Sequence, residues 1–148
     1  MGTTKFIKKG LEATLKIYVC APNKYEKYTK YLADRLEKNG YMAYYAARNT
    51  DQNKEDNEIF ESNLDSINNC DVFISYFVYD GYYGIDFASE TGYASKYKKV
   101  IGFIEIEKKF NAKLLDNLDD DLMLKHFIDA FFDNFEDLLT FLRSEISC

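Results

Sequence analysis

Three consecutive segments decide the fold: DVFISYFV (residues 71–78), GIDFASETGYA (84–94) and VIGFI (100–104). The first and third are short, continuous apolar runs, which are typical of buried strands in a parallel sheet. The segment between them has the pattern of an amphipathic helix that is preceded by a loop. A strand, a helix and a second strand in this order predict a βαβ unit.

Two acidic residues, Asp86 and Glu90, lie where this helix begins. Their spacing of four puts both side chains on one helix face, close to the carboxyl end of the preceding strand. Ligands of open α/β sheets bind at the carboxyl ends of strands, so the pair is a candidate site. The alternative is that Asp86 caps the helix and Glu90 is a solvated helical residue.

The same alternation of strands and helices extends in both directions from the βαβ unit. We expect strands at 15–21 and 41–46, helices at 24–39 and around 59–67, a polar loop at 48–57, and a loop with a helical piece at 108–125. Apolar residues at helical spacing predict one long helix over 127–146 that packs on the sheet or on a second subunit. The whole pattern predicts an α/β protein with a parallel sheet of four to five strands and helices on both faces.

Composition is that of one globular domain without a linker. The chain has 148 residues, of which 47% are hydrophobic, and we expect a single domain over residues 14–148. Residues 1–13 have no long apolar run, so we expect a lightly packed extension rather than a signal peptide or a membrane span. The net charge of −6 disfavours nucleic acid and anionic membrane surfaces as partners.

Cysteine and histidine usage gives no metal-binding pattern. Cys20, Cys70 and Cys148 are far apart, no CxxC spacing occurs, and His126 is the only histidine. We therefore expect neither a zinc site nor a disulfide framework, and we interpret Cys20 and Cys70 as small buried apolar residues. This usage suits a reducing, cytoplasmic environment.

Three segments together resemble the nucleoside 2-deoxyribosyltransferase-like family, which includes base-exchanging transferases and nucleotide N-glycosidases. KIYVCAP (residues 16–22) resembles the family's first strand, K-I-Y-L-A-G-P. LDSINNCDVFI (64–74) is similar to its aspartate-containing helix followed by a strand, and ETGYA (90–94) resembles E-[ILV]-G-[YF]-A. Order and spacing agree over about residues 15–105, and the resemblance implies a flavodoxin-like fold.

The resemblance implies roles for individual residues. Glu90 matches the nucleophile, Tyr18 the tyrosine that neighbours it, and Asp71 the aspartate that positions the base or sugar. Pro22 matches the proline that ends the first-strand motif. From the residues alone, Tyr18 is equally well an ordinary strand aromatic and Asp71 a polar residue at the start of a strand.

Two motifs of the family are altered in this chain. The D-x-G-T that precedes the glutamate is disturbed, because Gly84 takes the place of its aspartate while Asp86 and Asp80 lie nearby. Asp86 is the first candidate for the acid that meets the leaving base, and Asp80 is the second. The helical R-D-L has become Ser-Asn-Leu, so an amide, Asn63, stands where the family has a carboxylate.

The implied activity is transfer of 2-deoxyribose from a deoxynucleoside to another free nucleobase, without cofactor or metal, by a homodimer or larger homo-oligomer. Three alternatives stay open. A 2'-deoxynucleoside 5'-monophosphate would be hydrolysed if water attacks the sugar ester, and Lys24 or Lys27 would then meet the phosphate. A noncatalytic nucleotide-binding module fits the same scaffold. A TIR-like NAD glycohydrolase fits the E-T-G-Y-A context less well.

Overall fold

The computed structural model describes residues 5–8, 11–78, 84–105 and 121–146. Strands and helices alternate along most of this length, as the sequence predicts. The elements in chain order are β1 (Lys5–Lys8), β2 (Leu11–Thr14), β3 (Lys16–Cys20), the 3-10 turn η1 (Asn23–Tyr25), α1 (Glu26–Lys38), β4 (Met42–Tyr44), α2 (Ala46–Asn49), α3 (Asp56–Asn68), β5 (Val72–Phe77), α4 (Gly84–Ser95), β6 (Lys99–Ile104), α6 (Leu122–Phe127), β7 (Ala130–Phe132) and α7 (Phe135–Ile146).

The main sheet has five parallel strands in the order β4-β3-β5-β6-β7. If the strands are renumbered from β3 as strand 1, this is the 2-1-3-4-5 order of flavodoxin-like folds. The second strand, β4, lies on one side of β3, and the three later strands follow on its other side. The predicted fold class, a single α/β domain with a flavodoxin-like parallel sheet, is confirmed. A separate antiparallel pair, β1 with β2, precedes the main sheet and was not predicted.

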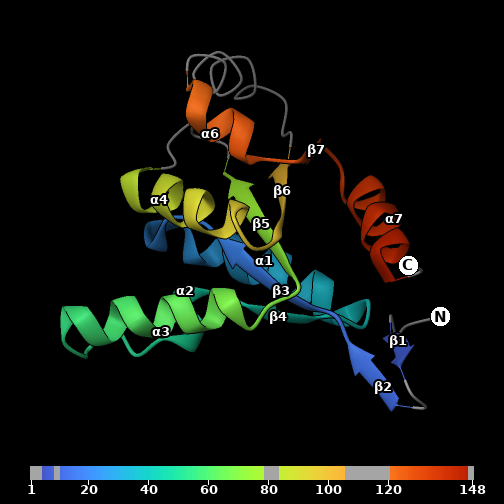
Figure 1. Ribbon diagram of the computed structural model, residues 1–148, viewed down its shortest axis with the longest axis horizontal. Coiled ribbons are helices and arrows are strands. Elements are labelled where there is room, and N and C mark those ends of the chain that lie inside the picture. Colours follow the sequence, from blue (N-terminus) through green and yellow to red (C-terminus); the bar gives the residue numbers. More distant parts are fainter. Residues whose placement is uncertain (1–4, 9–10, 79–83, 106–120, 147–148) are drawn as a thin grey trace.

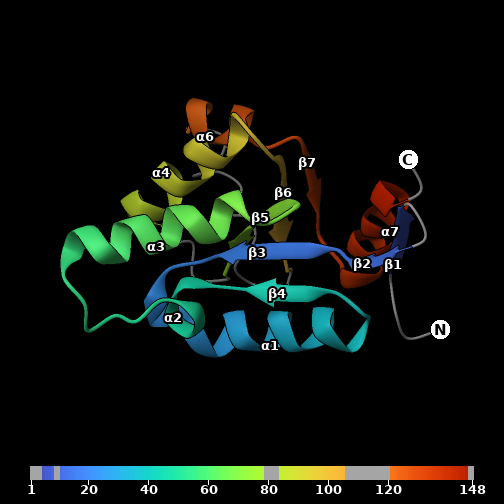
Figure 2. The same cartoon turned by 60° about the horizontal axis from the view of Figure 1, so that its bottom comes forward.

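Helices cover both faces of the sheet, and the alternation of side chains along each strand sorts them (Figures 1 and 2). Ile17 and Val19 of β3 point into a core with α1 and α7. Tyr18 and Cys20 of the same strand point into a second core with α3, α4 and α6. The continuous apolar runs in the sequence predict strands of this kind, which are buried and carry apolar residues on both faces.

The C-terminal segment differs from the prediction of one helix over 127–146. The structure divides it into α6, the three-residue strand β7 and α7, and β7 supplies the fifth strand of the sheet. A side-chain cap begins α7, because Asn134 Oδ1 accepts the backbone N–H of Asp137 at 2.9 Å and Asn134 Nδ2 donates to the Asp137 carboxylate at 2.8 Å. Such a reciprocal cap interrupts the helical pattern.

Two further boundaries differ from the sequence-based expectation. The predicted strand 41–46 ends at Tyr44, and α2 begins at Ala46. In α3 the expected apolar stripe is incomplete, because Ile67 is buried whereas Phe60 is 61% exposed. Hydrophobic spacing alone does not distinguish a packed face from an exposed one.

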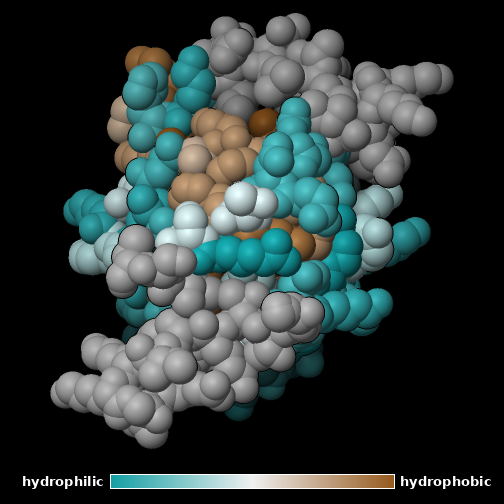
Figure 3. Space-filling model, turned by 90° about the vertical axis from the view of Figure 1, so that its right-hand side faces the viewer, coloured by the Kyte–Doolittle hydropathy of each residue, from teal (hydrophilic) through white to brown (hydrophobic). Residues whose placement is uncertain are grey.

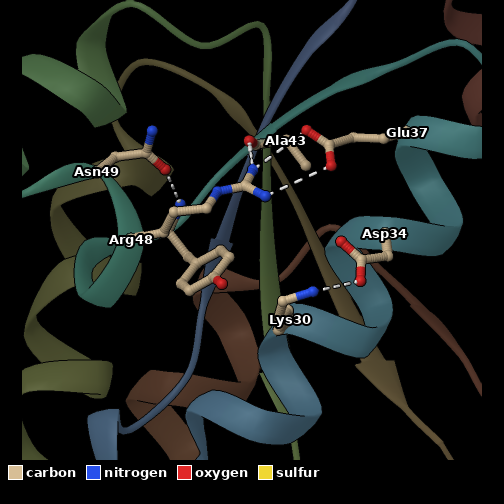
Figure 4. A network of polar contacts seen from close by, with 7 residues as sticks. Lys30, Asp34, Glu37, Ala43, Arg48 and Asn49 are labelled. Carbon is tan, nitrogen blue, oxygen red and sulfur yellow. Dashed lines mark hydrogen bonds and ion pairs between the residues drawn. The ribbon is translucent and has the colours of Figure 1, made fainter.

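Figure 4 shows the polar contacts that tie α2 to its neighbours. The Arg48 guanidinium donates to the carbonyl oxygen of Ala43 and to the two carboxylate oxygens of Glu37, at 3.2 and 3.4 Å. These contacts fix the short helix against β4 and α1. The position of Ala46, which begins α2, is fixed with them.

Aromatic side chains of β7 and α7 are incompletely covered. Phe131 is 39% exposed, and Phe132, Phe135 and Phe141 are half-buried. Figure 3 views the side of the molecule on which α7 lies, and apolar side chains gather near the middle of this face with hydrophilic ones around them. The expectation that the terminal helix lies at a subunit interface stays a prediction. None of the helices in the described ranges is long and apolar enough to cross a membrane.

Candidate active site

A cavity of about 640 Å³ lies at the carboxyl end of β3. Its walls come from the end of β3, the loop that follows it, the first turns of α4, one residue of α2, two residues of α3 and Gln52 between these two helices. This is the point between β3 and β5 where the strand order reverses, which is where open α/β sheets bind ligands. The volume falls within the roughly 300–1,000 Å³ of small-molecule sites.

Glu90 lies in the second turn of α4 and lines this cavity. The Tyr18 hydroxyl donates a hydrogen bond to Glu90 Oε1 at 3.3 Å, and the Cys20 thiol donates to the same oxygen at 3.4 Å. Both donors come from β3, because residues 18 and 20 share a face of the strand. The other carboxylate oxygen, Oε2, has no hydrogen-bond donor among the described residues.

The surroundings of Tyr18 and Cys20 keep the tyrosine hydroxyl and the cysteine thiol protonated. Burial, and then the Glu90 carboxylate, raise the pKa of Tyr18 well above its ordinary value. The same two causes raise the pKa of the Cys20 thiol. Tyrosine and cysteine that keep their protons can act only as neutral donors here, so Cys20 is not a thiolate nucleophile.

The carboxyl group of Glu90 also has a shifted pKa. Burial raises it, the hydrogen bonds from Cys20 and Tyr18 lower it, and the nearby Asp86 charge raises it, so that the net direction is upward. Such a carboxyl, in a cavity and perturbed by burial with a neighbouring charge, is typical of a functional site.

Packing fixes the two elements that carry this carboxylate and its donors. The Tyr18 ring stacks on Phe73 of β5, with centroids 5.5 Å apart and an interplanar angle of 12°. Thr91, next to Glu90, donates to the Phe87 carbonyl at 2.9 Å and lies 2.8 Å from the Ser75 hydroxyl of β5. Since the single proton of Thr91 is used on Phe87, Ser75 is the donor to Thr91. The pair joins α4 to the sheet at the position of Glu90.

Four of the other predicted site residues also line the cavity: Asp86, Pro22, Gly84 and Asn63. Asp86 lies in the first turn of α4 and is exposed. Gly84 begins α4 with a φ of 80°, a conformation that a residue with a Cβ adopts only under strain. Asn63 Oδ1 accepts a hydrogen bond from Thr50 at 2.8 Å, so the amide is fixed at the wall of the cavity.

Asp71 lies elsewhere. It precedes β5 at the amino end of the sheet and is not part of the cavity wall. Its Oδ2 accepts the backbone N–H of Lys16 at 2.8 Å, and Asp129 holds the N–H of Val100 in the same way. Asp71 therefore caps the start of a neighbouring strand, away from the cavity, and its expected contact with substrate stays a prediction. Asp80 lies outside the described residues.

Sequence reasoning missed Cys20, which was interpreted as a small buried apolar residue. The signal was present, because strand alternation places position 20 beside position 18 on the face that meets α4. Lys24 and Ile85 also line the cavity. Lys24 was considered only as a phosphate contact, and Ile85, which is 84% exposed, gave no signal.

In the described part of the chain, no group of three or more His, Cys, Asp or Glu side chains is arranged to hold a metal ion. The polar side-chain groups on the cavity wall are two carboxyl groups, a hydroxyl, a thiol, three amides and one lysine amine. Two carboxyl groups four residues apart on one helix can divide the work of nucleophile and proton donor at one ligand.

Comparisons with known proteins show similarity of fold. No protein-family model and no curated protein sequence matches this chain. The crystal structure of a conserved protein from Enterococcus faecalis V583 is similar, with a TM-score of 0.60 and 20% sequence identity over 86% of this chain and 96% of that chain. A 2-deoxyribosyltransferase from the psychrotolerant bacterium Bacillus psychrosaccharolyticus has a TM-score of 0.56 and 19% identity, with coverage of 83% and 89%. The chain thus has the same flavodoxin-like fold as these two proteins.

Proposed function

We propose that this protein is a nucleoside 2-deoxyribosyltransferase in which Glu90 is the nucleophile. The observation that carries the proposal is a half-buried carboxylate held by two neutral donors on the wall of a cavity of about 640 Å³. The fold shared with a 2-deoxyribosyltransferase, and the resemblance around Glu90, support the same reaction.

The reaction begins with attack of Glu90 on C1′ of the sugar. A bond forms between the carboxylate oxygen and C1′ as the C1′–N bond breaks, and its electron pair goes to the nitrogen of the leaving base. The carboxylate also stabilises the positive charge that develops on the sugar, as in retaining glycosidases. Asp86 gives the proton that the base takes up, since it is the second carboxyl of the cavity and interacts with Glu90.

A second base completes the cycle. Its nitrogen attacks C1′ of the glycosyl ester, the C1′–O bond breaks, and the electron pair returns to Glu90 while the incoming base gives its proton to Asp86. The Tyr18 and Cys20 donors stabilise the departing carboxylate in this step.

The test is base exchange, followed by chromatography, from a panel of deoxynucleosides with a second free base. Glu90→Gln should reduce exchange on the order of 10³-fold or more, because the amide cannot form the ester. Glu61→Gln, an exposed glutamate of α3, is the matched control and should keep wild-type activity. Intact-protein mass spectrometry of wild type with substrate and no acceptor should reveal the mass of one added deoxyribosyl group.

Hydrolysis of a 5'-monophosphate is the second candidate, and one observation favours it. Lys24 lines the cavity, so a cation is available for a phosphate at the end of β3. Under this alternative, base release requires the monophosphate and falls in Lys24→Ala. Lys27→Ala is the matched control, because Lys27 makes the same kind of contact over a tyrosine ring but is not part of the cavity wall.

Absence of turnover with every deoxynucleoside and monophosphate, in folded wild-type protein, would contradict both enzymatic candidates. Calorimetric binding of a nucleotide without base release would then identify the protein as a binding module.

A further inference from the structure

We propose that Cys20 is a positioning residue for Glu90: its thiol and the Tyr18 hydroxyl together hold Oε1 and leave Oε2 as the oxygen that meets the sugar. For the reacting atom this inference rests on the function proposed above. The contact itself can be tested without substrate.

The first step is the geometry of the two donors. Tyr18 and Cys20 approach the same carboxylate oxygen, at 3.3 and 3.4 Å, from one strand. Both side chains are buried, with exposures of 1% and 3%. Oxygen Oε1 is thus turned toward β3 by two fixed groups, and Oε2 is the oxygen left for the cavity that Glu90 lines.

The second step is the direction in which the thiol proton points. Cys20 Sγ has two acceptors within reach, Glu90 Oε1 at 3.4 Å and the carbonyl oxygen of Phe87 at 4.0 Å. The carboxylate is the nearer and the charged acceptor, so the single S–H proton is directed to it. The Phe87 carbonyl already accepts the Thr91 hydroxyl at 2.9 Å.

The third step is the consequence for the carboxylate. A hydrogen bond to the charged form favours that form, and the Cys20 and Tyr18 bonds lower the pKa of Glu90 while burial and Asp86 raise it. The titratable groups that face Glu90 among the described residues are Tyr18 and Cys20 from β3 and Asp86 from α4, with Lys24 on the same cavity. Loss of the thiol therefore removes one of the two hydrogen bonds that favour the ionised form of the half-buried Glu90.

The fourth step is chemical. When Oε2 becomes the ester oxygen, Oε1 becomes the carbonyl oxygen of that ester and keeps both donors. The same two donors then stabilise the carboxylate when the ester breaks, so they act on the leaving group as well as on the nucleophile.

The experiment is a carbon-13 NMR titration of the Glu90 carboxyl group in protein labelled at glutamate carboxyl carbons, with Glu90→Gln to assign the signal. Cys20→Ala should move the titration midpoint to higher pH, and Tyr18→Phe, which removes the other donor, should move it in the same direction. Cys20→Ser keeps a donor and should leave the midpoint at or below that of wild type.

Cys70→Ala is the matched control. Cys70 is also 3% exposed, lies in the same core, and keeps its proton, because burial raises its pKa to about 12. Its thiol makes no hydrogen bond to Glu90 and is not among the causes of the Glu90 pKa shift, so its removal should leave the midpoint where it is in wild type. Equal midpoints in Cys20→Ala, Cys70→Ala and wild type would overturn the inference, as would a Cys20→Ser variant that behaves like Cys20→Ala.

Activity separates this inference from the proposed function. In an active wild type, Cys20→Ala should lower kcat/KM roughly 3- to 10-fold on the acid side of the pH profile and less above it. A uniform loss at all pH values would indicate a packing role and overturn the inference. Wild-type protein that releases no base would contradict the proposed function, whereas a shifted midpoint in Cys20→Ala would still support the contact.

Discussion

At the scale of single residues, the main feature is a carboxylate kept in a place that disfavours its charge. The native pKa of Glu90 lies above the ordinary 4.5, so between those two values the folded protein binds more protons than the unfolded chain. Stability falls with rising pH wherever the folded state binds more protons. Ionised Glu90 therefore costs stability at neutral pH, and below about pH 4.5 this cost disappears.

The corresponding prediction concerns Glu90→Gln. This variant should be more stable than wild type at pH 7, by about 1 kcal/mol, because removal of a strained active-site charge commonly stabilises. The gain should vanish near pH 4, where Glu90 is protonated in both states. Urea unfolding at the two pH values measures this gain in stability. A gain that is the same at both pH values would contradict the assignment of a half-buried, ionised Glu90.

A second residue-scale prediction concerns Tyr18→Phe. The phenylalanine ring keeps the stack on Phe73, so the urea midpoint should stay close to that of wild type. The lost hydrogen bond to a charged group corresponds to roughly a 10- to 100-fold decrease in base exchange. A fully active Tyr18→Phe variant would remove the hydroxyl from the proposed mechanism.

Much of the candidate site could be predicted from the sequence. The spacing of Asp86 and Glu90 at a helix start predicts that the two act together, and the resemblance to the family adds Tyr18; the structure brings all three to one cavity. The contact of Cys20 with Glu90 was not predicted, because a cysteine outside any metal-binding or disulfide pattern is expected to be a small buried apolar residue. Asp71 lies outside this cavity, because a residue that precedes a strand is at the opposite end of a parallel sheet from the residues that follow its strands.

At the scale of elements, the hydroxyl pair of Ser75 and Thr91 joins α4 to β5. Both side chains are fully buried, and Ser75 donates to Thr91. Thr91→Val should reduce the free energy of unfolding by about 1–3 kcal/mol, because the Ser75 hydroxyl is left buried without its acceptor. Chemical denaturation measures the loss.

A double-mutant cycle refines this prediction. Ser75→Ala combined with Thr91→Val should cost less than the sum of the single changes, since no unpaired hydroxyl remains. Thr140→Val is the matched control, because the Thr140 hydroxyl also donates to a carbonyl four residues earlier but is exposed. This substitution should change the free energy of unfolding by no more than about 0.5 kcal/mol. Strict additivity of the two buried changes would indicate that they do not interact.

Strand β7 shows where sequence reasoning fails at this scale. Phe127, Phe131 and Phe135 have helical spacing, yet Phe131 belongs to a strand of three residues. Three residues are too few to show the two-residue alternation of apolar and polar side chains that marks a strand. Pairing with β6 determines the extended conformation of this segment. The better signal was the Asp133-Asn134 pair with Asp137 three residues after Asn134, which is typical of a helix start.

At the scale of the whole molecule, a charged cluster on the face opposite the cavity connects α1, the sheet and the C-terminal segment. Arg35 donates to both oxygens of Glu105, at 2.8 and 2.6 Å, and Tyr76 donates to the same carboxylate at 2.9 Å. The guanidinium lies between the rings of Tyr31 and Phe135, 4.3 and 4.6 Å from their centroids. Its side chain is 19% exposed.

Arg35→Met should lower the free energy of unfolding by about 2 kcal/mol. This loss is smaller than that expected when a fully buried ion pair is broken, because Glu105 keeps some contact with water. Combined replacement of Arg35 and Glu105 by methionine should recover part of this loss. Lys30→Ala, which removes one partner of the exposed Lys30–Asp34 pair of Figure 4, should leave the urea midpoint unchanged.

Since the sheet separates Arg35 from the cavity, the KM for a substrate should not change in Arg35→Met, and a large change would show that the two faces are coupled.

The pairing of β3 with β5 also has a consequence for the newly made chain. Tyr18 and Glu90 are 72 residues apart in the sequence. A ribosome that adds about 5–20 residues per second needs roughly 4–14 s to cover that distance. β3 lacks its central neighbour until β5 (Val72–Phe77) has been translated, and the Cys20 thiol lacks its Glu90 acceptor for the whole interval. The candidate site is thus assembled only once α4 has been translated.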